Sequence, residues 1–150
     1  MTDTKRVFEQ ALALQQRGEL KAAAEAYRRV LAQQPLHAGA WINLGTLCRR
    51  TGDPDEALRC YRNAQSLPDA PAELDFNLGN LHQALHQPAD AEAAYRRLLE
   101  RLPTHRPARL QLARLLASEG RLGEAAEAFK RLLKDHATDV DAWLELGNCR

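Results

Sequence analysis

The sequence of 150 residues is poor in cysteine and has no long hydrophobic run. Its three cysteines, Cys48, Cys60 and Cys149, are odd in number and show no paired spacing, which favours reduced thiols over a disulfide framework. No stretch approaches the length of a membrane span, and the N-terminal Met-Thr-Asp-Thr-Lys-Arg lacks the apolar run of a secretory signal. We therefore expect a cytoplasmic protein without a membrane segment.

The sequence also lacks an excess of charge of one sign. Its 21 lysines and arginines nearly balance its 20 aspartates and glutamates, which gives a net charge of +1. Phosphate binding usually appears as a basic excess or stripe, so the balance argues against a nucleic-acid partner. Aromatic residues make up only 5% of the chain and fall mainly at repeating core positions, which leaves no stacking platform for bases.

Motifs of catalysis are missing as well. The sequence has no glycine-rich phosphate loop, no nucleophile elbow and no coherent set of Ser, His and Asp. His82 and His86 stand one helical turn apart, a spacing that can offer two imidazoles to a metal, but no third ligand is evident. His37, His105 and His136 lie near expected loops, where we expect solvated side chains. We predict that the protein is not an enzyme and has no catalytic residue, cofactor or metal site.

What the sequence does contain is a 34-residue repeat. One aromatic column and several columns of small residues keep the same phase along the chain. The aromatic column is Tyr27, Tyr61, Tyr95 and Phe129, and an alanine column is Ala23, Ala57, Ala91 and Ala125. Further small residues recur at Ala11, Gly45, Gly79, Ala113 and Gly147, and turn glycines at Gly18, Gly52 and Gly120. A period of this length is typical of a helix-turn-helix solenoid.

Local spacing predicts two helices in each repeat. Within residues 38–67, apolar residues recur three and four positions apart, in two stripes that each lie on one helical face. Between the stripes, Gly52 suits the left-handed conformation that ends a helix, Asp53 can cap the next helix and Pro54 suits its first turn. We predict helix pairs over 4–36, 38–70, 72–104 and 106–138, followed by one helix from 140 onward.

These columns resemble the tetratricopeptide repeat family, whose pattern runs Trp, Leu-Gly, Tyr, Ala, an aromatic and then Pro. Trp41 and Trp143 occupy the tryptophan column, and Pro35 and Pro103 close two repeats. The resemblance covers nearly the whole chain and implies an all-α, right-handed superhelical solenoid of antiparallel helix pairs. It implies about four repeats plus one extra helix in a single domain, residues 1–150. Departures are Val7, Asp75 and Arg109 in the tryptophan column and His86 in the turn-glycine column.

In such a fold the first helix of each pair lines a concave groove. The position after the tryptophan column is apolar, and the next position is an amide in the central repeats. The apolar positions are Phe8, Ile42, Phe76 and Leu110, the amides are Asn43, Asn77 and Gln111, and further groove positions are Thr46, Asn80, Arg49, Arg50 and Arg114. Because amides both donate and accept, they can satisfy a peptide backbone, while the arginines favour acidic ligands. The alternative is that the apolar column packs between helices and the amides are solvated.

The predicted function is therefore a protein interaction scaffold that binds an extended peptide or partner segment. Asn43 and Asn77 resemble the asparagine ladder of O-linked N-acetylglucosamine transferases and of bacterial multi-repeat proteins. The carboxylate clamp of chaperone adaptors is disfavoured, since only Asn43 matches it. Two alternatives remain: a substrate-recruiting domain of a larger modifying enzyme such as a glycosyltransferase, and self-association through Trp143, Leu144 and Leu146, which we expect to be exposed. The unfinished last repeat suggests the N-terminal part of a longer protein.

Overall fold

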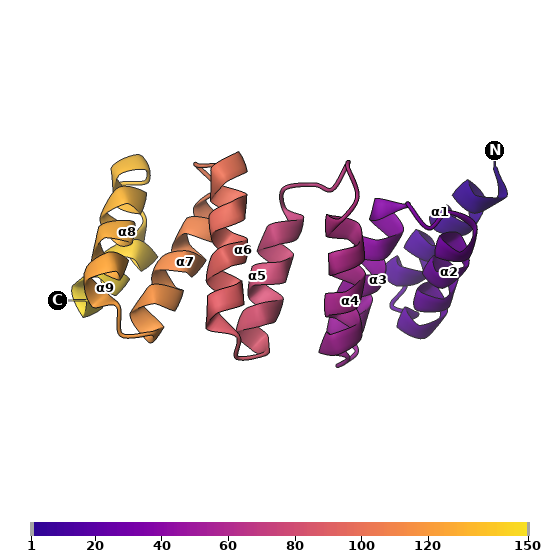
Figure 1. The fold of residues 1–150 in the computed structure, drawn as a ribbon, viewed down its shortest axis with the longest axis horizontal. Coiled ribbons are helices and arrows are strands. Elements are labelled where there is room, and N and C mark those ends of the chain that lie inside the picture. Colours follow the sequence, from indigo (N-terminus) through magenta and orange to yellow (C-terminus); the bar gives the residue numbers. More distant parts are fainter. Residues whose placement is uncertain (1, 150) are drawn as a thin grey trace. The chain divides into compact units, whose positions relative to one another are not determined.

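The computed structural model describes residues 2–149, and over these residues the chain consists of nine α-helices without a strand (Figure 1). The helices are α1 (Asp3–Gln16), α2 (Leu20–Gln33), α3 (Ala38–Arg50), α4 (Pro54–Gln65), α5 (Leu74–Ala84), α6 (Pro88–Arg101), α7 (Arg106–Ser118), α8 (Leu122–Asp135) and α9 (Val140–Asn148). Four helix pairs and one further helix follow the repeat, which confirms the predicted all-α solenoid.

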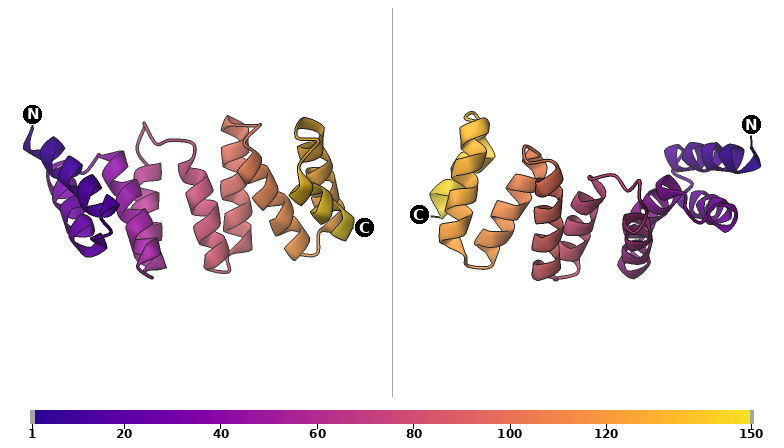
Figure 2. Two further views of the ribbon diagram at one scale, coloured as in Figure 1. Left: turned by 180° about the vertical axis from the view of Figure 1, so that it is seen from behind. Right: turned by 45° about the horizontal axis from the view of Figure 1, so that its top comes forward.

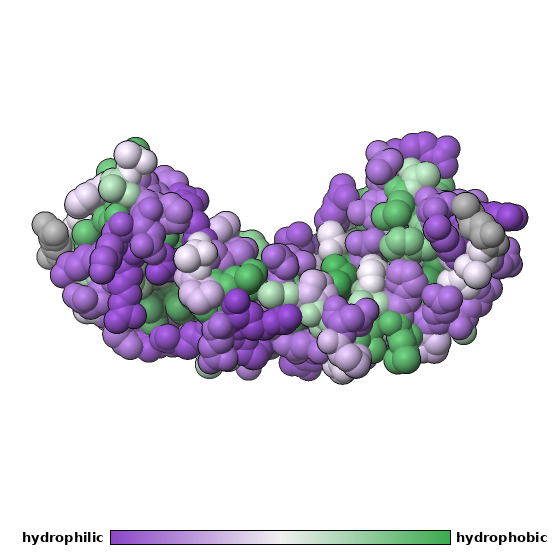
Figure 3. Space-filling view, turned by 90° about the horizontal axis from the view of Figure 1, so that it is seen from above, coloured by the Kyte–Doolittle hydropathy of each residue, from purple (hydrophilic) through white to green (hydrophobic). Residues whose placement is uncertain are grey.

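The helices fall into two compact units, residues 1–74 and 75–150. In the first unit α1 packs on α2, α2 on α3 and α3 on α4; in the second, α6 packs on α7, α7 on α8 and α8 on α9. The two opposite views in Figures 1 and 2 show α6 and α8 on one side of the second unit and α7 on the other. Hydrophilic side chains cover most of the visible surface of each unit, with smaller hydrophobic patches (Figure 3).

The aromatic column fills the core of both units. Tyr27, Tyr61, Tyr95 and Phe129 are completely buried. Each central tyrosine lies against the glycine of its own pair, because a Cβ atom on Gly45 would come within 2.7 Å of the Tyr61 ring and one on Gly79 within 2.4 Å of the Tyr95 ring. Glycine is therefore required at these two positions for close helix packing, since any side chain would displace the ring.

The turns within the pairs follow the predicted chemistry. Gly18, Gly52 and Gly120 have positive φ angles of 79°, 85° and 76°, as expected for left-handed residues that end a helix. In the same column, His86 adopts a φ of 57° although it carries a side chain. For an L-residue this conformation costs about 1–2 kcal/mol, so the turn between α5 and α6 is strained.

The caps of the second helices differ from repeat to repeat. Asp53 Oδ1 accepts a hydrogen bond of 3.1 Å from the Glu56 N–H, which confirms the predicted cap of α4. At the matching position before α6, the side chain of Gln87 makes no cap bond. Its Oε1 atom lies 2.8 Å from Nδ1 of the buried His82 instead. The polar side chain at this position therefore stabilises the turn in one repeat and a core histidine in another.

The cysteines are free, and Cys48 and Cys60 are buried side by side in the first unit. Burial raises the pKa of the Cys60 thiol to about 12, so almost no thiolate is present at neutral pH. Both residues pack as small hydrophobic groups. In the part of the chain that the structure describes, no helix has the length and apolar character that crossing a membrane requires.

Candidate protein-binding surface

The predicted amides differ in how much of their bonding capacity is used. Asn43 is half-buried on α3, and its side chain makes a hydrogen bond with the hydroxyl of Tyr27. Burial raises the pKa of Tyr27, and this bond offsets part of the rise. An asparagine amide has two N–H groups and an oxygen with two lone pairs, so one bond to Tyr27 leaves capacity for a ligand.

Asn77 on α5 and Gln111 on α7 are also half-buried. Neither side chain makes a hydrogen bond within residues 2–149. Partly exposed amides without protein partners are solvated in the free protein, and a ligand backbone can replace that water without disturbing any internal bond. These two residues are the best candidates for contacts with a peptide.

Thr46 and Asn80, predicted as groove residues, bind the buried tyrosines of their own pairs. The Thr46 hydroxyl lies 3.0 Å from the Tyr61 hydroxyl and donates to the Ile42 carbonyl oxygen at 3.0 Å. The Tyr95 hydroxyl is 2.7 Å from Asn80 Oδ1 and 2.5 Å from Gln83 Oε1. A buried hydroxyl requires such a partner, so these side chains have a structural role that the sequence reasoning missed.

A signal for this role exists in the spacing. Thr46 and Asn80 each precede their tyrosine by 15 residues, and Gln15 and Gln83 precede theirs by 12. Both spacings connect the first helix of a pair to the aromatic column of the second. A polar residue at either place therefore predicts a partner for the tyrosine hydroxyl.

The aromatic members of the apolar column pack against the helix caps. Phe8 lies 5.8 Å from the Tyr27 ring and 4.5 Å from the His37 ring, and Phe76 lies 6.1 Å from Tyr95 and 5.4 Å from His105. His37 and His105, expected as solvated, are half-buried, and their Nδ1 atoms accept hydrogen bonds from the N–H groups of Ala40 and Ala108 at 3.0 and 3.1 Å. Each histidine caps the next first helix and covers one face of the phenylalanine.

The aliphatic members of that column vary in exposure. Ile42 is half-buried, Leu110 is 5% exposed and Leu144 is 64% exposed. Leu110 is thus a core residue of the second unit, as in the packing alternative. Ile42 and the accessible edges of Phe8 and Phe76 are the parts of this column that a ligand can reach.

The three predicted arginines are not equivalent. Arg114 Nε lies 3.3 Å from Glu145 Oε1, so its charge is partly neutralised within the second unit. Arg49 and Arg50 are exposed in the last turn of α3, where positive charge is favourable because helix dipoles are negative at the C-terminal end. Among the described residues neither has an ion-pair partner, so both are available to an acidic ligand.

The last helix exposes part of its apolar pattern. Trp143 is 53% exposed, and its Nε1 atom donates to the Ala137 carbonyl oxygen at 2.8 Å; Leu144 is 64% exposed. Leu146, however, is only 3% exposed. The prediction that Leu146 is exposed is wrong, because the leucine column of a first helix faces the preceding second helix and α9 packs on α8.

The two histidines weighed as a metal pair differ in environment. His82 is buried and hydrogen-bonded to Gln87, whereas His86 is exposed in the strained turn. Over residues 2–149 no group of three His, Cys, Asp or Glu side chains is arranged to bind a metal ion.

Stacked antiparallel helix pairs with a fixed 34-residue period define an all-α repeat protein of the kind that acts as a protein interaction scaffold. The chain belongs to the tetratricopeptide repeat family. The family model described as "Tetratricopeptide repeat" matches residues 8–71, 76–140 and 110–150. Proteins of this family and fold are generally non-catalytic scaffolds that bind protein or peptide partners.

Solved structures with this fold are numerous. MamA is 20% identical, with a TM-score of 0.89 over 97% of this chain and 80% of its own. YrrB, described as a TPR protein with an unusual peptide-binding site, is 25% identical, with a TM-score of 0.85 over 98% of this chain and 76% of its own. A tetratricopeptide repeat protein from Parabacteroides merdae is 26% identical, with a TM-score of 0.89 over 94% and 56%. No curated protein matches the sequence.

Proposed function

We propose that this protein is an interaction scaffold in which the first helices of each unit bind an extended peptide segment of a partner protein. The observation that carries the proposal is the pair of half-buried amides, Asn77 and Gln111, that have no hydrogen-bond partner within the described residues. Asn43 adds a third amide with spare bonding capacity. The description of YrrB as a peptide-binding tetratricopeptide repeat protein supports this use of the fold.

The amides recognise the backbone and not the sequence of the peptide. Each can donate to a peptide carbonyl and accept from a peptide N–H, which suits an extended segment whose backbone groups are free. Ile42 and the edges of Phe8 and Phe76 provide apolar contacts, and Arg49 and Arg50 favour acidic segments. Exposed charges increase the association rate more than the affinity. A transient complex of this kind has a dissociation constant in the micromolar range, which corresponds to a binding free energy of about −8 kcal/mol.

The test is calorimetric titration of a panel of extended peptides against the wild type and an Asn43→Ala/Asn77→Ala double variant. We expect the double variant to bind at least about tenfold more weakly, because each truncation removes a backbone contact. Asn63→Ala is the matched control, since Asn63 is a half-buried asparagine on the second helix α4. Unchanged affinity in the double variant would remove Asn43 and Asn77 from the binding site. The resemblance of Asn43 and Asn77 to the asparagine ladder of O-linked N-acetylglucosamine transferases stays a prediction.

A second candidate function is self-association through α9, which the exposure of Trp143 and Leu144 favours. Light scattering over a concentration series should show dimers or longer assemblies that Leu144→Ser abolishes. Leu36→Ser is the matched control, because Leu36 is 75% exposed in the first unit. A strict monomer at all concentrations would contradict this role. Substrate recruitment for a larger modifying enzyme would use the same amides and also stays a prediction.

A further inference from the structure

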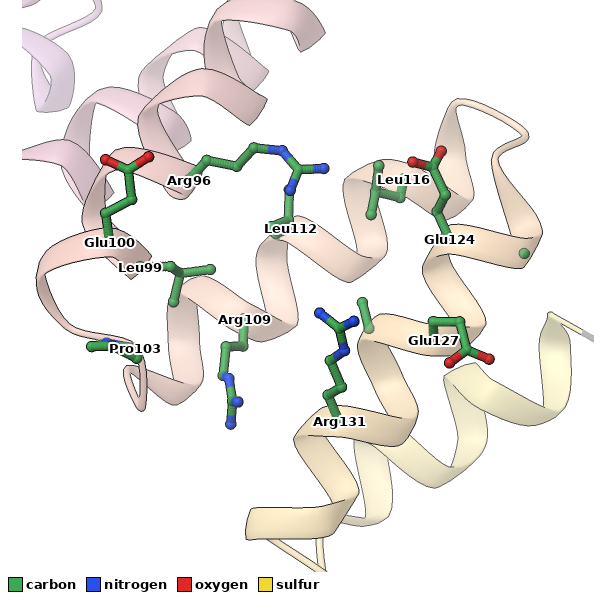
Figure 4. A pocket seen from close by; sticks show the side chains of 12 residues that line it. Arg96, Leu99, Glu100, Pro103, Arg109, Leu112, Leu116, Glu124, Glu127 and Arg131 are labelled. Carbon is green, nitrogen blue, oxygen red and sulfur yellow. The ribbon is translucent and has the colours of Figure 1, made fainter.

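The second unit contains a pocket that the proposed peptide site does not use. It lies between α6, α7 and α8 and has a volume of about 660 Å³ (Figure 4). Its apolar lining includes Leu99 of α6 and Leu112 and Leu116 of α7. Arginine and glutamate side chains from α6, α7 and α8 surround these leucines, as Figure 4 shows.

This pocket faces away from the predicted peptide-binding side chains of α7. Successive residues of an α-helix are rotated by about 100°, so Leu110 and Arg114, each two residues from Leu112, lie about 200° around the helix from it. Leu116, four residues from Leu112, shares its face. The pocket therefore opens on the side where the second helices α6 and α8 lie, and it is a separate surface of the unit.

The pocket coincides with a departure from the tryptophan column. In two other repeats a tryptophan of this column donates from Nε1 to a carbonyl oxygen six residues earlier: Trp41 to Pro35 and Trp143 to Ala137, both at 2.8 Å. In the repeat that begins with α7 the corresponding residues are Arg109 and Pro103, and both line the pocket.

Arg109 does not replace the missing indole. Its guanidinium lies 2.5 Å from Asp135 Oδ2, and in Figure 4 it points away from Leu99 and Leu112. The pocket thus lies at the repeat position where two other repeats of the chain carry an indole, with Pro103 again at its edge.

Among the described residues, one cation at the edge of the pocket has no ion-pair partner. Arg96 is paired with Glu92, Arg109 with Asp135, Glu124 with Arg121 and Glu127 with Lys130. Arg131 has no hydrogen bond or ion pair through its side chain within residues 2–149, and it extends from α8 toward α7 in Figure 4. Glu100 is also without an ion pair in this region, but its carboxylate points away from Leu99. An anionic group beside an apolar one therefore complements the pocket.

We propose that this pocket binds an aromatic side chain of a partner protein, with tryptophan as the best fit, and that an acidic residue next to it pairs with Arg131. The leucines contact the ring, and the carbonyl oxygen of Pro103 is the acceptor for an indole N–H, as those of Pro35 and Ala137 are for Trp41 and Trp143. This site goes beyond the proposed peptide-binding function and does not depend on it.

The test uses the peptide acetyl-Gly-Trp-Asp-Asp-Gly-amide as the probe and follows the backbone amides of the whole chain by NMR. We expect saturable shifts at Gly123, which lines the pocket, and at Leu116. Replacing Trp by Ala in the peptide should abolish the shifts, and replacing both Asp by Lys should weaken binding at least fivefold. No saturable shift, or shifts centred on Gln111 and Arg114, would overturn the proposal, because the peptide would then not bind in this pocket.

Two variants fill the pocket by different routes. Arg109→Trp restores the residue type that two other repeats carry, and Gly123→Leu adds a side chain where a Cβ meets no atom within 4 Å. Each should lower the affinity for the probe at least tenfold, and circular dichroism checks that the helices are intact. Probe binding unaffected by a folded filling variant would overturn the proposal.

A further pair of variants tests the charge. Arg131→Gln should lower the affinity for the probe about fivefold. Arg29→Gln, at the same repeat position on α2, should have no effect on that affinity. Equal effects of the two substitutions would contradict a role for Arg131. The Asn43→Ala/Asn77→Ala variant should bind the probe normally, so failure of this site and failure of the proposed peptide site are distinguishable.

Discussion

The two units are built from the same repeat but use charge differently. In the first unit, the ion pairs among the described residues join close neighbours in sequence: Arg17 with Glu19, and Arg59 with Glu56. In the second unit, several pairs join residues of different helices or turns. They are Arg97 with Asp75, Arg121 with Glu92, Arg109 with Asp135, Arg106 with Asp139, and Arg114 with Glu145.

The tryptophan column accounts for part of this difference. In the first unit the Trp41 indole donates to the Pro35 carbonyl oxygen just before α3, whereas in the second unit Arg109 at the same repeat position pairs with Asp135 at the end of α8. The same repeat position therefore carries a hydrogen-bonded indole in one repeat and an ion-paired guanidinium in another. The repeat with the ion-paired Arg109 contains an open pocket, which is the binding site that we propose in the second unit.

The largest expected effect is common to both units and concerns the aromatic core. Tyr61→Ala and Tyr95→Ala should each lower the free energy of unfolding by about 3–5 kcal/mol, because both rings are completely buried against a glycine. Urea unfolding followed by circular dichroism measures the loss. Tyr61→Phe, which removes only the bond to Thr46, should cost about 1 kcal/mol. A cost below that of Tyr61→Phe for Tyr95→Ala would show that the second unit relies on its ion pairs and not on its core.

The next effect is a loss of stability at low pH, which we expect in the second unit and not in the first. Hydrogen bonds from Arg106 and from the Ala142 N–H hold the pKa of the buried Asp139 below its usual range. The pKa of Asp139 is lower in the folded chain than in the unfolded chain, where it is about 3.9. The stabilisation is therefore complete above about pH 5 and is lost as the pH falls through the folded value. Asp139→Asn should reduce the stability of α9 by about 1.5 kcal/mol at pH 7 and by less at pH 3.

Hydrogen exchange of the α9 amides at the two pH values measures this difference. Asp53→Asn is the control in the first unit, because Asp53 caps α4 in the same way but forms no ion pair within the described residues. It should change exchange of α4 little at either pH. The same loss for both variants at pH 7 would contradict a special role of the Arg106 pair.

The turns provide a reciprocal test of about 1 kcal/mol. His86→Gly should stabilise the second unit by about this amount, because glycine adopts a φ of 57° without the cost that a side chain imposes. Gly52→His should destabilise the first unit by a similar amount, since φ at Gly52 is 85°. Thermal unfolding of both variants measures the two effects. Destabilisation by His86→Gly would mean that the imidazole makes a contact that outweighs the strain.

The smallest expected effect is a dependence on salt. Arg97→Gln should lower the stability of the second unit by about 0.5 kcal/mol at low salt, because the Arg97 side chain is 45% exposed and its pair with Asp75 is partly screened. In 1 M NaCl, where the screening length is about 3 Å, the difference should vanish. Hydrogen exchange of α5 and α6 at the two salt concentrations is the measurement. An effect that persists in 1 M NaCl would show that the arginine stem stabilises by packing.

Much of the fold was predictable from the order of residues alone. Two observed helices lie in each of the helix pairs predicted over 4–36, 38–70, 72–104 and 106–138, except that α1 begins one residue earlier, at Asp3. The turn glycines adopt the conformation that was predicted for Gly52. Such features depend on interactions within one or two turns of the chain, which the local spacing of residues specifies. The burial of Leu146 was not predicted, because it depends on how closely α9 approaches α8.

The binding surface was predictable only as a set of positions. By itself the sequence determined the period, the pairing of helices and the aromatic core, because a repeated pattern constrains every copy in the same way. The tertiary structure decided that Thr46 and Asn80 satisfy tyrosine hydroxyls, that Leu110 is buried and that a pocket opens beside Arg109. These outcomes depend on distances of a few ångströms between side chains from different helices, and the sequence pattern does not encode those distances.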